Sequence, residues 1–273
     1  MKLATHLSQG RLVYLSQQQD AMTVNENDYY RWMAFNDVVQ SVMLIRKPSQ
    51  LTLPHHIAVL LPLLFFKPKK IVELGLGGGN LTRFLHQLSE DISLTTIEHS
   101  QVVIDSFKQY FNPECATLAI VCDDGMSWLQ RYIESYAKTD VDSYAGTYVE
   151  TNTENDIDFI ICDVYQSQTL GFNVIVKQLE IISMALNSDA CASINLPDIS
   201  DSEIQLCLTI LQQLNPGHRI THFAIPSYLN IVMHLTPKHW PLHRLIKKNK
   251  HSYLSSVRFN RWKRFWQHGI HTS

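Results

Sequence analysis

Four of the ten glycines in this 273-residue chain fall within five positions, in the segment Ile71-Val-Glu-Leu-Gly-Leu-Gly-Gly-Gly-Asn-Leu81. The segment follows a short apolar run and opens a stretch, 80–88, whose apolar residues recur at helical spacing. Glycines at a strand-to-helix junction permit a tight turn and let a ligand approach the backbone and the helix N-terminus. We therefore take Gly75, Gly77 and Gly79 as candidate ligand-binding positions. A tight turn without a ligand is the alternative.

Short β-type runs alternate with helical stretches after this loop, a pattern typical of a mostly parallel sheet covered on both faces. The two final strands have no helix between them, which predicts an antiparallel hairpin at the sheet edge. The expected strands are 71–75, 93–97, 118–122, 158–162, 190–194, 219–224 and 229–235, and the expected helices are 80–88, 101–111, 126–137, 174–186 and 202–214.

The segment before the sheet has a different pattern. Three β-type runs at 12–15, 29–35 and 38–45, with Asn36-Asp37 as a turn, predict a small N-terminal β module over residues 1–50. A helix over Pro54–Phe66 would join it to a nucleoside-binding domain over residues 51–237, and residues 238–273 would form a C-terminal extension. The polar, acidic stretch 139–156 predicts a solvated loop.

Composition excludes several classes of protein. With 45% hydrophobic and 18% charged residues, the chain is neither collagen-like nor wholly disordered. Its longest apolar run, 57–66, is interrupted by Pro62 and is far shorter than the roughly 20 residues of a membrane span. Five scattered cysteines without a CxxC spacing, three of them in expected strands, predict buried reduced thiols and no metal site. Together with the lack of a secretory signal, this favours a cytoplasmic protein.

Acidic residues end successive expected strands beside the glycine loop. A nicotinamide fingerprint requires glycine where this chain has Asn80. Glu73, ahead of the loop, suits a ligand with an ammonium group, Glu98 could accept both ribose hydroxyls, and Asp124 could accept an adenine amino hydrogen. Each acid alone is more often a helix cap than a ligand contact. Because ligands of open α/β sheets bind at the carboxyl ends of strands, the three together favour adenosine without a pyrophosphate, as in S-adenosylmethionine or a derivative.

On these residues the chain resembles the spermidine synthase-like (polyamine aminopropyltransferase-like) branch of the class I methyltransferase fold. The resemblance spans roughly residues 10–235. It rests on Asn36-Asp37-Val-Val-Gln40-Ser, the helix beginning Pro54-His55-His56, the loop Gly75–Gly79, Glu98, Asp123-Asp124-Gly125 and Asp163.

The resemblance implies a small N-terminal β domain before a Rossmann-like domain, and transfer of an aminopropyl group from decarboxylated S-adenosylmethionine to a polyamine. It implies that Gln40, Glu98 and Asp124 contact the nucleoside, and that Asp163 lies beside the acceptor amine. The family's loop aspartate is replaced by Gly78, and the second acid after the fourth strand is replaced by Gln166. A diamine is a dication that needs several carboxylates, so the ordinary putrescine site is incomplete.

An amine acceptor must lose a proton before it can attack a sulfonium donor. Its pKa near 10.4 makes this cost about 4.6 kcal/mol at pH 7 unless a local base accepts the proton. Asp163, with Tyr165 or His55, is the candidate group for orienting and deprotonating the acceptor. A capping role for Asp163, a purely structural His55 and a wall position for Tyr165 are the alternatives. We therefore expect an enzyme that transfers methyl or aminopropyl groups to a small, amine-bearing acceptor.

The C-terminal extension gives a second functional hypothesis. All 25 acidic residues lie within 1–203, whereas 238–273 holds nine Lys/Arg interleaved with aromatic residues. We expect an amphipathic helix packed on the body or on a second copy of the chain, since Trp262, Phe265 and Trp266 share one helical face. Nucleic-acid binding is the less favoured alternative. A nucleoside-binding protein without turnover, acting as an interaction module through this extension, is the competing function.

Overall fold

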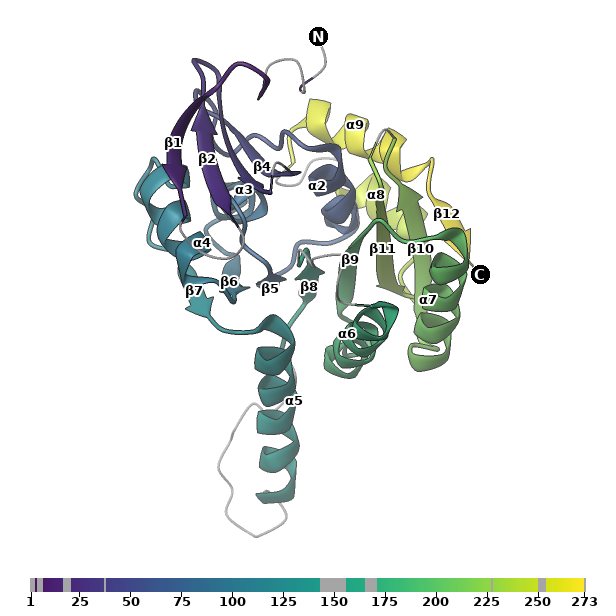
Figure 1. Cartoon of the computed structure of the whole chain (residues 1–273). Helices are drawn as coiled ribbons and strands as arrows, with labels where there is room; N and C mark the ends of the chain where they lie inside the picture. Colours follow the sequence, from purple (N-terminus) through teal and green to yellow (C-terminus); the bar gives the residue numbers. More distant parts are fainter. Residues whose placement is uncertain are drawn as a thin grey trace.

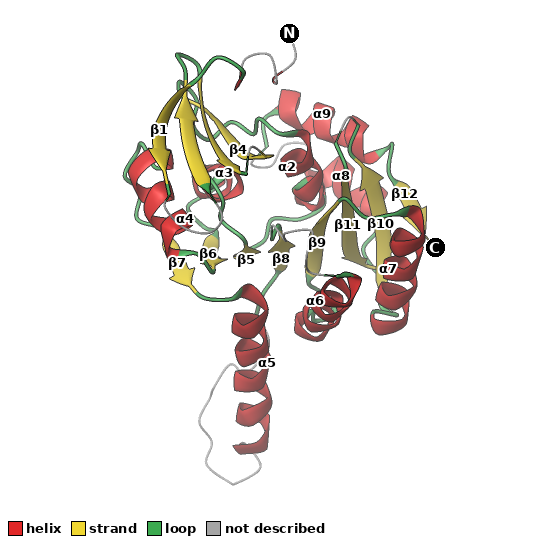
Figure 2. Ribbon diagram, in the orientation of Figure 1, coloured by secondary structure: helices red, strands yellow, loops and turns green. Residues whose placement is uncertain are grey.

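The computed structural model describes residues 3, 7–16, 21–36, 38–142, 156–164, 171–226, 228–249 and 254–272. In this part of the chain the strands form a four-stranded sheet and an eight-stranded sheet. The smaller sheet stands at the upper left of Figure 1, above the β5–β7 side of the larger sheet. Figure 2 shows helices on both faces of the larger sheet.

The small sheet is an antiparallel meander in the order β1-β2-β3-β4. The residue Asn36 adopts a left-handed φ of 43° in the β3–β4 hairpin, and this conformation explains a tight turn without glycine. The expected β module is present, but it contains one strand, β2, that was not predicted. The bounds are β1 Arg11–Leu15, β2 Met22–Glu26, β3 Tyr30–Phe35 and β4 Val38–Leu44.

The large sheet has the order β12-β10-β11-β9-β8-β5-β6-β7. The strands from β9 to β7 in this order are parallel, whereas β11 runs antiparallel to both β9 and β10. This is the predicted Rossmann-like arrangement. The bounds are β5 Lys70–Leu74, β6 Ser93–Glu98, β7 Ala119–Cys122, β8 Phe159–Cys162, β9 Cys191–Pro197, β10 His218–Ala224, β11 Asn230–Pro237 and β12 Ile270–Thr272.

The predicted hairpin of β10 and β11 exists, but it is not the edge of the sheet. The edge position belongs to β12, which pairs antiparallel with β10. The short β12 follows a basic helix and has no alternating apolar pattern, so nothing in its sequence distinguished it as a strand. The last residues of the chain thus complete the sheet.

Helices cover both faces of the large sheet and bury separate cores. On one face α2, α3 and α9 pack around Ile71 and Phe159, and on the other α5, α6 and α7 pack around Val72 and Ile160. This alternation follows from the period of two along each strand. The bounds are α2 Pro54–Val59, α3 Asn80–Leu88, α4 Gln101–Ser106, α5 Gly125–Asp142, α6 Phe172–Ala185, α7 Asp201–Leu214, α8 Leu242–Asn249 and α9 Ser256–Trp266.

Three predicted segments differ from the structure. The linking helix ends at Val59 and continues as a 3₁₀ turn, η1 Leu61–Leu64, because Pro62 cannot continue an α-helix. The helix expected over 101–111 changes to a π-helix at η2 Phe107–Phe111. Helix α5 runs on to Asp142, into the expected loop 139–156, because no glycine or proline stops it there; residues 143–155 lie outside the described part.

The cysteines and the C-terminal extension complete the fold. All five cysteines are free, but Cys122 is exposed although it lies in a strand, because β7 is an edge strand. In the extension, Phe259, Trp262 and Trp266 are buried in the same core as α2 and η1, so the expected packing on the body is confirmed. Among the described residues, no helix is long and apolar enough to span a bilayer.

Candidate functional site

The glycine loop joins β5 to α3 at the carboxyl end of the sheet and requires left-handed backbone at three positions. Gly75, Gly77 and Gly79 have φ values of 95°, 49° and 64°. A Cβ atom on Gly75 would clash with the carbonyl oxygen of Asp163, and one on Gly79 would clash with the ring of Phe107. Glycine is therefore required there both by conformation and by close approach.

Hydrogen bonds with β4 of the small sheet fix the position of this loop. The hydroxyl oxygen of Ser41, on β4, accepts a 2.8 Å hydrogen bond from the Gly78 N–H. The side-chain amide of Asn80 donates to the Val42 carbonyl at 2.7 Å, so the residue that departs from the nicotinamide fingerprint ties α3 to β4. Directly before Ser41, Gln40 is the unpaired residue of a β-bulge, a feature that redirects a side chain. Gln40 is half-buried.

Glu98 ends β6 and accepts hydrogen bonds with both carboxylate oxygens. Oε2 accepts from the Leu76 N–H of the glycine loop at 3.1 Å, and Oε1 accepts from the Ser100 N–H at 2.9 Å. Nδ1 of His99 lies 3.0 Å from Oε1. Burial acts to raise the pKa of Glu98, but these hydrogen bonds outweigh it and lower the pKa below its ordinary value. Glu98 is therefore a buried anion bound to the loop.

Asp124 follows β7 at an exposed position and precedes α5. Its Oδ1 accepts from the Ser127 N–H at 2.8 Å, the geometry of a helix cap, which the sequence analysis had kept as an alternative. Partial burial acts to raise the pKa of Asp124, but the hydrogen bonds of Ser127 and the nearby His99 lower it. The hydrogen bond to Glu98 raises the pKa of His99, and Asp124 adds to this effect. The two acids thus influence the same imidazole.

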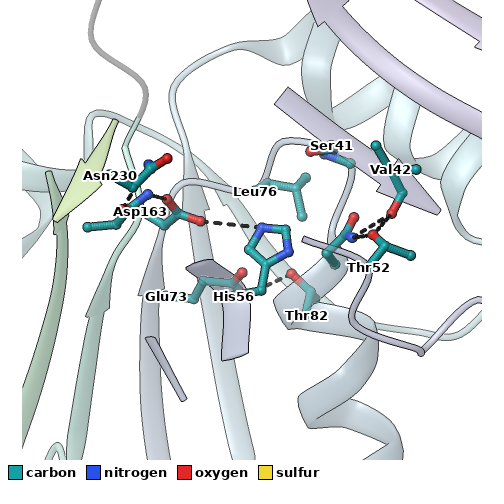
Figure 3. A network of polar contacts seen from close by, with 12 residues as sticks. Ser41, Val42, Thr52, His56, Glu73, Leu76, Thr82, Asp163 and Asn230 are labelled. Carbon is teal, nitrogen blue, oxygen red and sulfur yellow. Dashed lines mark hydrogen bonds and ion pairs between the residues drawn. The ribbon is translucent and has the colours of Figure 1, made fainter. Parts of the chain in front are cut away.

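Glu73 points into the protein between α3 and β6. Its Oε2 accepts hydrogen bonds from the hydroxyls of Thr82 at 2.7 Å and Thr96 at 2.9 Å (Figure 3 shows the first). Burial raises the pKa of Glu73 to about 8 in spite of these two hydrogen bonds. At neutral pH the group therefore holds its proton, and its described partners are threonines of the scaffold.

Asp163 lies directly after β8, and polar side chains meet at its carboxylate (Figure 3). Oδ1 accepts a 2.6 Å hydrogen bond from Nδ2 of Asn195 on β9, whose own Oδ1 accepts from Asn230 on β11 at 3.1 Å. Oδ2 lies 3.8 Å from Nε2 of His56 on α2. The antiparallel insertion of β11 beside β9 is what brings Asn230 into this network.

His55 and His56 begin α2, one residue after Pro54 at the first helical position. Their rings are 4.3 Å apart between centroids, and Tyr228 lies 6.2 Å from His55. Burial lowers the pKa of both histidines, although Asp163 partly opposes the shift for His55. Both imidazoles are therefore neutral at pH 7. With Asp163, they are the residues of this site that could hold a metal ion.

The structure thus divides the predicted site residues into two groups. Glu98 and Asp124 flank His99 at one side of the loop, whereas His55 and Glu73 both interact electrostatically with Asp163. Tyr165 lies outside the described residues. Five further residues of the site were not predicted from the sequence: Ser41, His56, His99, Asn195 and Asn230. Of these, Asn195 carried a usable signal, because a lone amide in the buried strand 191–197 requires a hydrogen-bond partner.

This architecture occurs in solved enzymes. The spermidine synthase of Thermotoga maritima superimposes with a TM-score of 0.63 at 15% identity, over 90% of this chain and 79% of that one. The chain has the spermidine synthase fold. A probable spermidine synthase from Corynebacterium glutamicum gives a TM-score of 0.63 at 15% identity, over 89% of this chain and 88% of its own.

The same kind of sheet also occurs in a methyltransferase-like structure. Human methyltransferase-like protein 13, solved in complex with SAH, gives a TM-score of 0.53 at 18% identity, over 79% of this chain and 91% of that one. No family model and no curated protein matches the sequence. At such identities the similarity establishes the fold, including the predicted combination of an α/β Rossmann-like sheet and a small N-terminal β domain.

Proposed function

We propose that the chain is an alkyltransferase, which binds S-adenosylmethionine or its decarboxylated form and transfers a methyl or aminopropyl group to a small amine. The observation that carries the proposal is Glu98, a buried, ionised carboxylate bound to the glycine loop at the carboxyl end of β6. Ligands of open α/β sheets bind at that end of the strands. A solved spermidine synthase holds the transition state analogue AdoDATO, and human methyltransferase-like protein 13 holds SAH.

The residues present suit such a donor chemically. Carboxylates attract a sulfonium cation and accept hydrogen bonds from ribose hydroxyls. Glu98 and Asp124 supply two carboxylates at the ends of the adjacent strands β6 and β7. The glycines carry no side chains, so a ligand could lie close to the loop backbone, although the N–H groups of Leu76 and Gly78 already donate to Glu98 and Ser41. When bound, the donor supplies an electrophilic carbon attached to a positively charged sulfur.

The acceptor would react at Asp163. Its amine nitrogen attacks the donor carbon, the carbon–sulfur bond breaks with its electron pair passing to sulfur, and the amine proton passes to Asp163. Asn195 holds one oxygen of this carboxylate and leaves the other available. Positioning of the reactants can lower the activation free energy by up to about 7–11 kcal/mol.

The surroundings of Asp163 favour an acceptor with a single charge. Glu73 is protonated at neutral pH, and His55 and His56 are neutral. Asp163 is therefore the one described anion in this group, whereas a dication such as putrescine calls for several carboxylates. We accordingly propose a monoamine as the preferred substrate class.

Calorimetry with four nucleosides tests donor binding: S-adenosylmethionine, decarboxylated S-adenosylmethionine, S-adenosylhomocysteine and methylthioadenosine. Preference for the carboxylated donor selects methyl transfer, and preference for the decarboxylated donor selects aminopropyl transfer. Glu98→Gln should weaken binding about 10- to 100-fold, because a hydrogen bond to a charged group contributes about 1.5–3 kcal/mol. Glu180→Gln, exposed on α6, is the matched control. Absence of binding to all four nucleosides would refute the proposal.

Catalysis is tested separately with Asp163→Asn. Thioether release should be lost with every amine tried, while the nucleoside Kd stays unchanged. Unchanged turnover would remove Asp163 from the mechanism. Nucleoside binding without turnover by the wild-type chain, across monoamines and diamines, would instead support the non-catalytic interaction module, which the fold similarity does not favour.

A further inference from the structure

Two histidines and one carboxylate converge beside the glycine loop with suitable chemistry for a metal ion. One ligand atom from each of His55, His56 and Asp163 lies within 4.8 Å of the other two. The histidines come from the first turn of α2, and Asp163 comes from the end of β8, so two elements far apart in sequence form the group.

The histidines are buried without the hydrogen bonds that buried imidazoles require. Nδ1 of His55 and Nδ1 of His56 have no partner among the described residues, and the two side chains are 9% and 4% exposed. Nε2 of His56 lies 3.8 Å from Asp163 Oδ2, which is too long for a hydrogen bond. Leaving a buried polar atom unpaired is costly. An ion held between Nε2 of His56 and Oδ2 of Asp163 would give that imidazole nitrogen a partner.

Asp163 is already oriented as a metal-binding carboxylate would be. Asn195 donates to its Oδ1, which leaves Oδ2 on the side of the histidines. Metal-binding side chains are usually held by such hydrogen bonds from a second layer of residues. The carboxylate is 20% exposed, so an ion has a route from solvent.

We propose that His55, His56 and Asp163 form a binding site for a divalent transition metal ion of the zinc class. Two neutral imidazoles and a carboxylate are a ligand set that suits Zn²⁺ and its first-row neighbours. Three protein ligands leave a coordination position for water or a small molecule. The proposal does not depend on the alkyltransferase function, although both use Asp163.

Binding requires a modest contraction of the group. Ligands about 2.1 Å from a tetrahedral ion are about 3.4 Å apart, and the His56–Asp163 pair at 3.8 Å is already close to this value. The remaining movement would have to come from His55, whose ligand atom lies within 4.8 Å of the other two. Arg83, whose guanidinium donates to main-chain carbonyls of Gly78 and Phe111, acts electrostatically on His56 and opposes a cation, so coordination by the two imidazoles and the Asp163 carboxylate must outweigh this repulsion.

The test uses the full-length chain with Zn²⁺ and, as a spectroscopic probe, Co²⁺. Metal content after dialysis should be one ion per chain, and Co²⁺ should give the visible absorption of a tetrahedral nitrogen–oxygen site. His56→Ala and Asp163→Asn should each weaken the metal affinity at least about tenfold. His86→Ala, exposed on α3, should leave it unchanged. Circular dichroism and Tm confirm that each variant is folded.

Asp163→Asn keeps the shape of the side chain, so it remains informative if His56→Ala fails to fold. A metal-induced rise in Tm that is present in the wild type and absent in Asp163→Asn supports the site. Failure of the wild type to retain either ion, or equal affinity in wild type and Asp163→Asn, would overturn it. Nucleoside affinity, measured on the same samples without metal, reports on the alkyltransferase proposal independently.

Discussion

The side-chain amide of Asn195 donates a 2.6 Å hydrogen bond to Oδ1 of Asp163, which fixes the orientation of the carboxylate on which both proposals depend. Asn195 is in turn held by Asn230, so the two amides form a chain across three strands. The carboxylate therefore occupies one orientation before any ligand arrives, which reduces the free-energy cost of binding.

Removal of this amide should affect Asp163 without unfolding the sheet. For Asn195→Ala we expect Co²⁺ affinity to fall about 10- to 100-fold, the usual effect of losing a residue that orients a metal ligand. Nucleoside affinity should stay at the wild-type value. Titration by visible absorption and by calorimetry measures the two quantities. Asn187→Ala, which removes the hydrogen bonds of that side chain with Ile157 and Asp189 outside this network, is the control. An equal loss of both affinities would indicate general damage rather than misplacement of Asp163.

Because of Glu73, the free energy of unfolding should depend on pH between about 4.5, its ordinary pKa, and about 8, its pKa in the folded chain. Its pKa is about 8 in the folded chain and 4.5 ordinarily, so the folded state binds a proton that the unfolded state has lost. Stability is therefore highest below about pH 4.5 as far as this group is concerned, and falls as pH rises toward 8. Glu73→Gln should remove this loss, with a gain on the order of 3 kcal/mol at pH 7.

Urea unfolding at pH 5 and pH 8 measures the effect of Glu73→Gln. The variant should gain stability over the wild type at pH 8 and much less at pH 5, whereas Glu180→Gln should follow the wild type at both values. A gain that is the same at both pH values would mean that Glu73 does not hold a proton in the folded chain.

Gly75 should not tolerate alanine. Its φ of 95° disfavours any L side chain, and the added Cβ would clash with the Asp163 carbonyl. We expect Gly75→Ala to lower the free energy of unfolding by more than about 1 kcal/mol and to displace Asp163. Gly171→Ala is a matched control, because no atom lies within 4 Å of its Cβ position. Equal stability of the two variants in urea would show that the loop does not need its left-handed turn.

The alternation of strands and helices could be predicted from the sequence, because each buried parallel strand is a short apolar run and each helix has an apolar stripe. Helix 80–88 has the predicted bounds. The orientation of Glu73 could also have been deduced, since period two places it on the face of Ile71, toward α3 and Thr82. Because Glu73 lies beside the glycine loop, a ligand was the expected partner of its carboxyl group, and a hydrogen bond from Thr82 was not.

The contacts of Asp163 could not be predicted in the same way. They depend on the register of β8, β9 and β11, and on how α2 lies over their ends, neither of which a local pattern determines. The sequence therefore pointed to His55 as the imidazole partner of Asp163, whereas Nε2 of His56 is the ring nitrogen 3.8 Å from it. The strand β12 was missed for a related reason, because its pairing with β10 depends on where α9 packs.

The C-terminal helix should contribute to the stability of the whole sheet domain. Trp266 is 6% exposed and packs edge-on against Phe65, which follows η1, at 4.6 Å between ring centroids. Its ring is tilted against Phe223 of β10 at 5.4 Å. Trp266→Ala should lower the free energy of unfolding by about 3–5 kcal/mol through the cavity it creates. Arg261→Ala, exposed on the same helix, should cost less than about 0.5 kcal/mol. A Trp266→Ala chain as stable in urea as Arg261→Ala would mean that α9 is not part of the folded core, and the basic extension would then be available to bind nucleic acid instead.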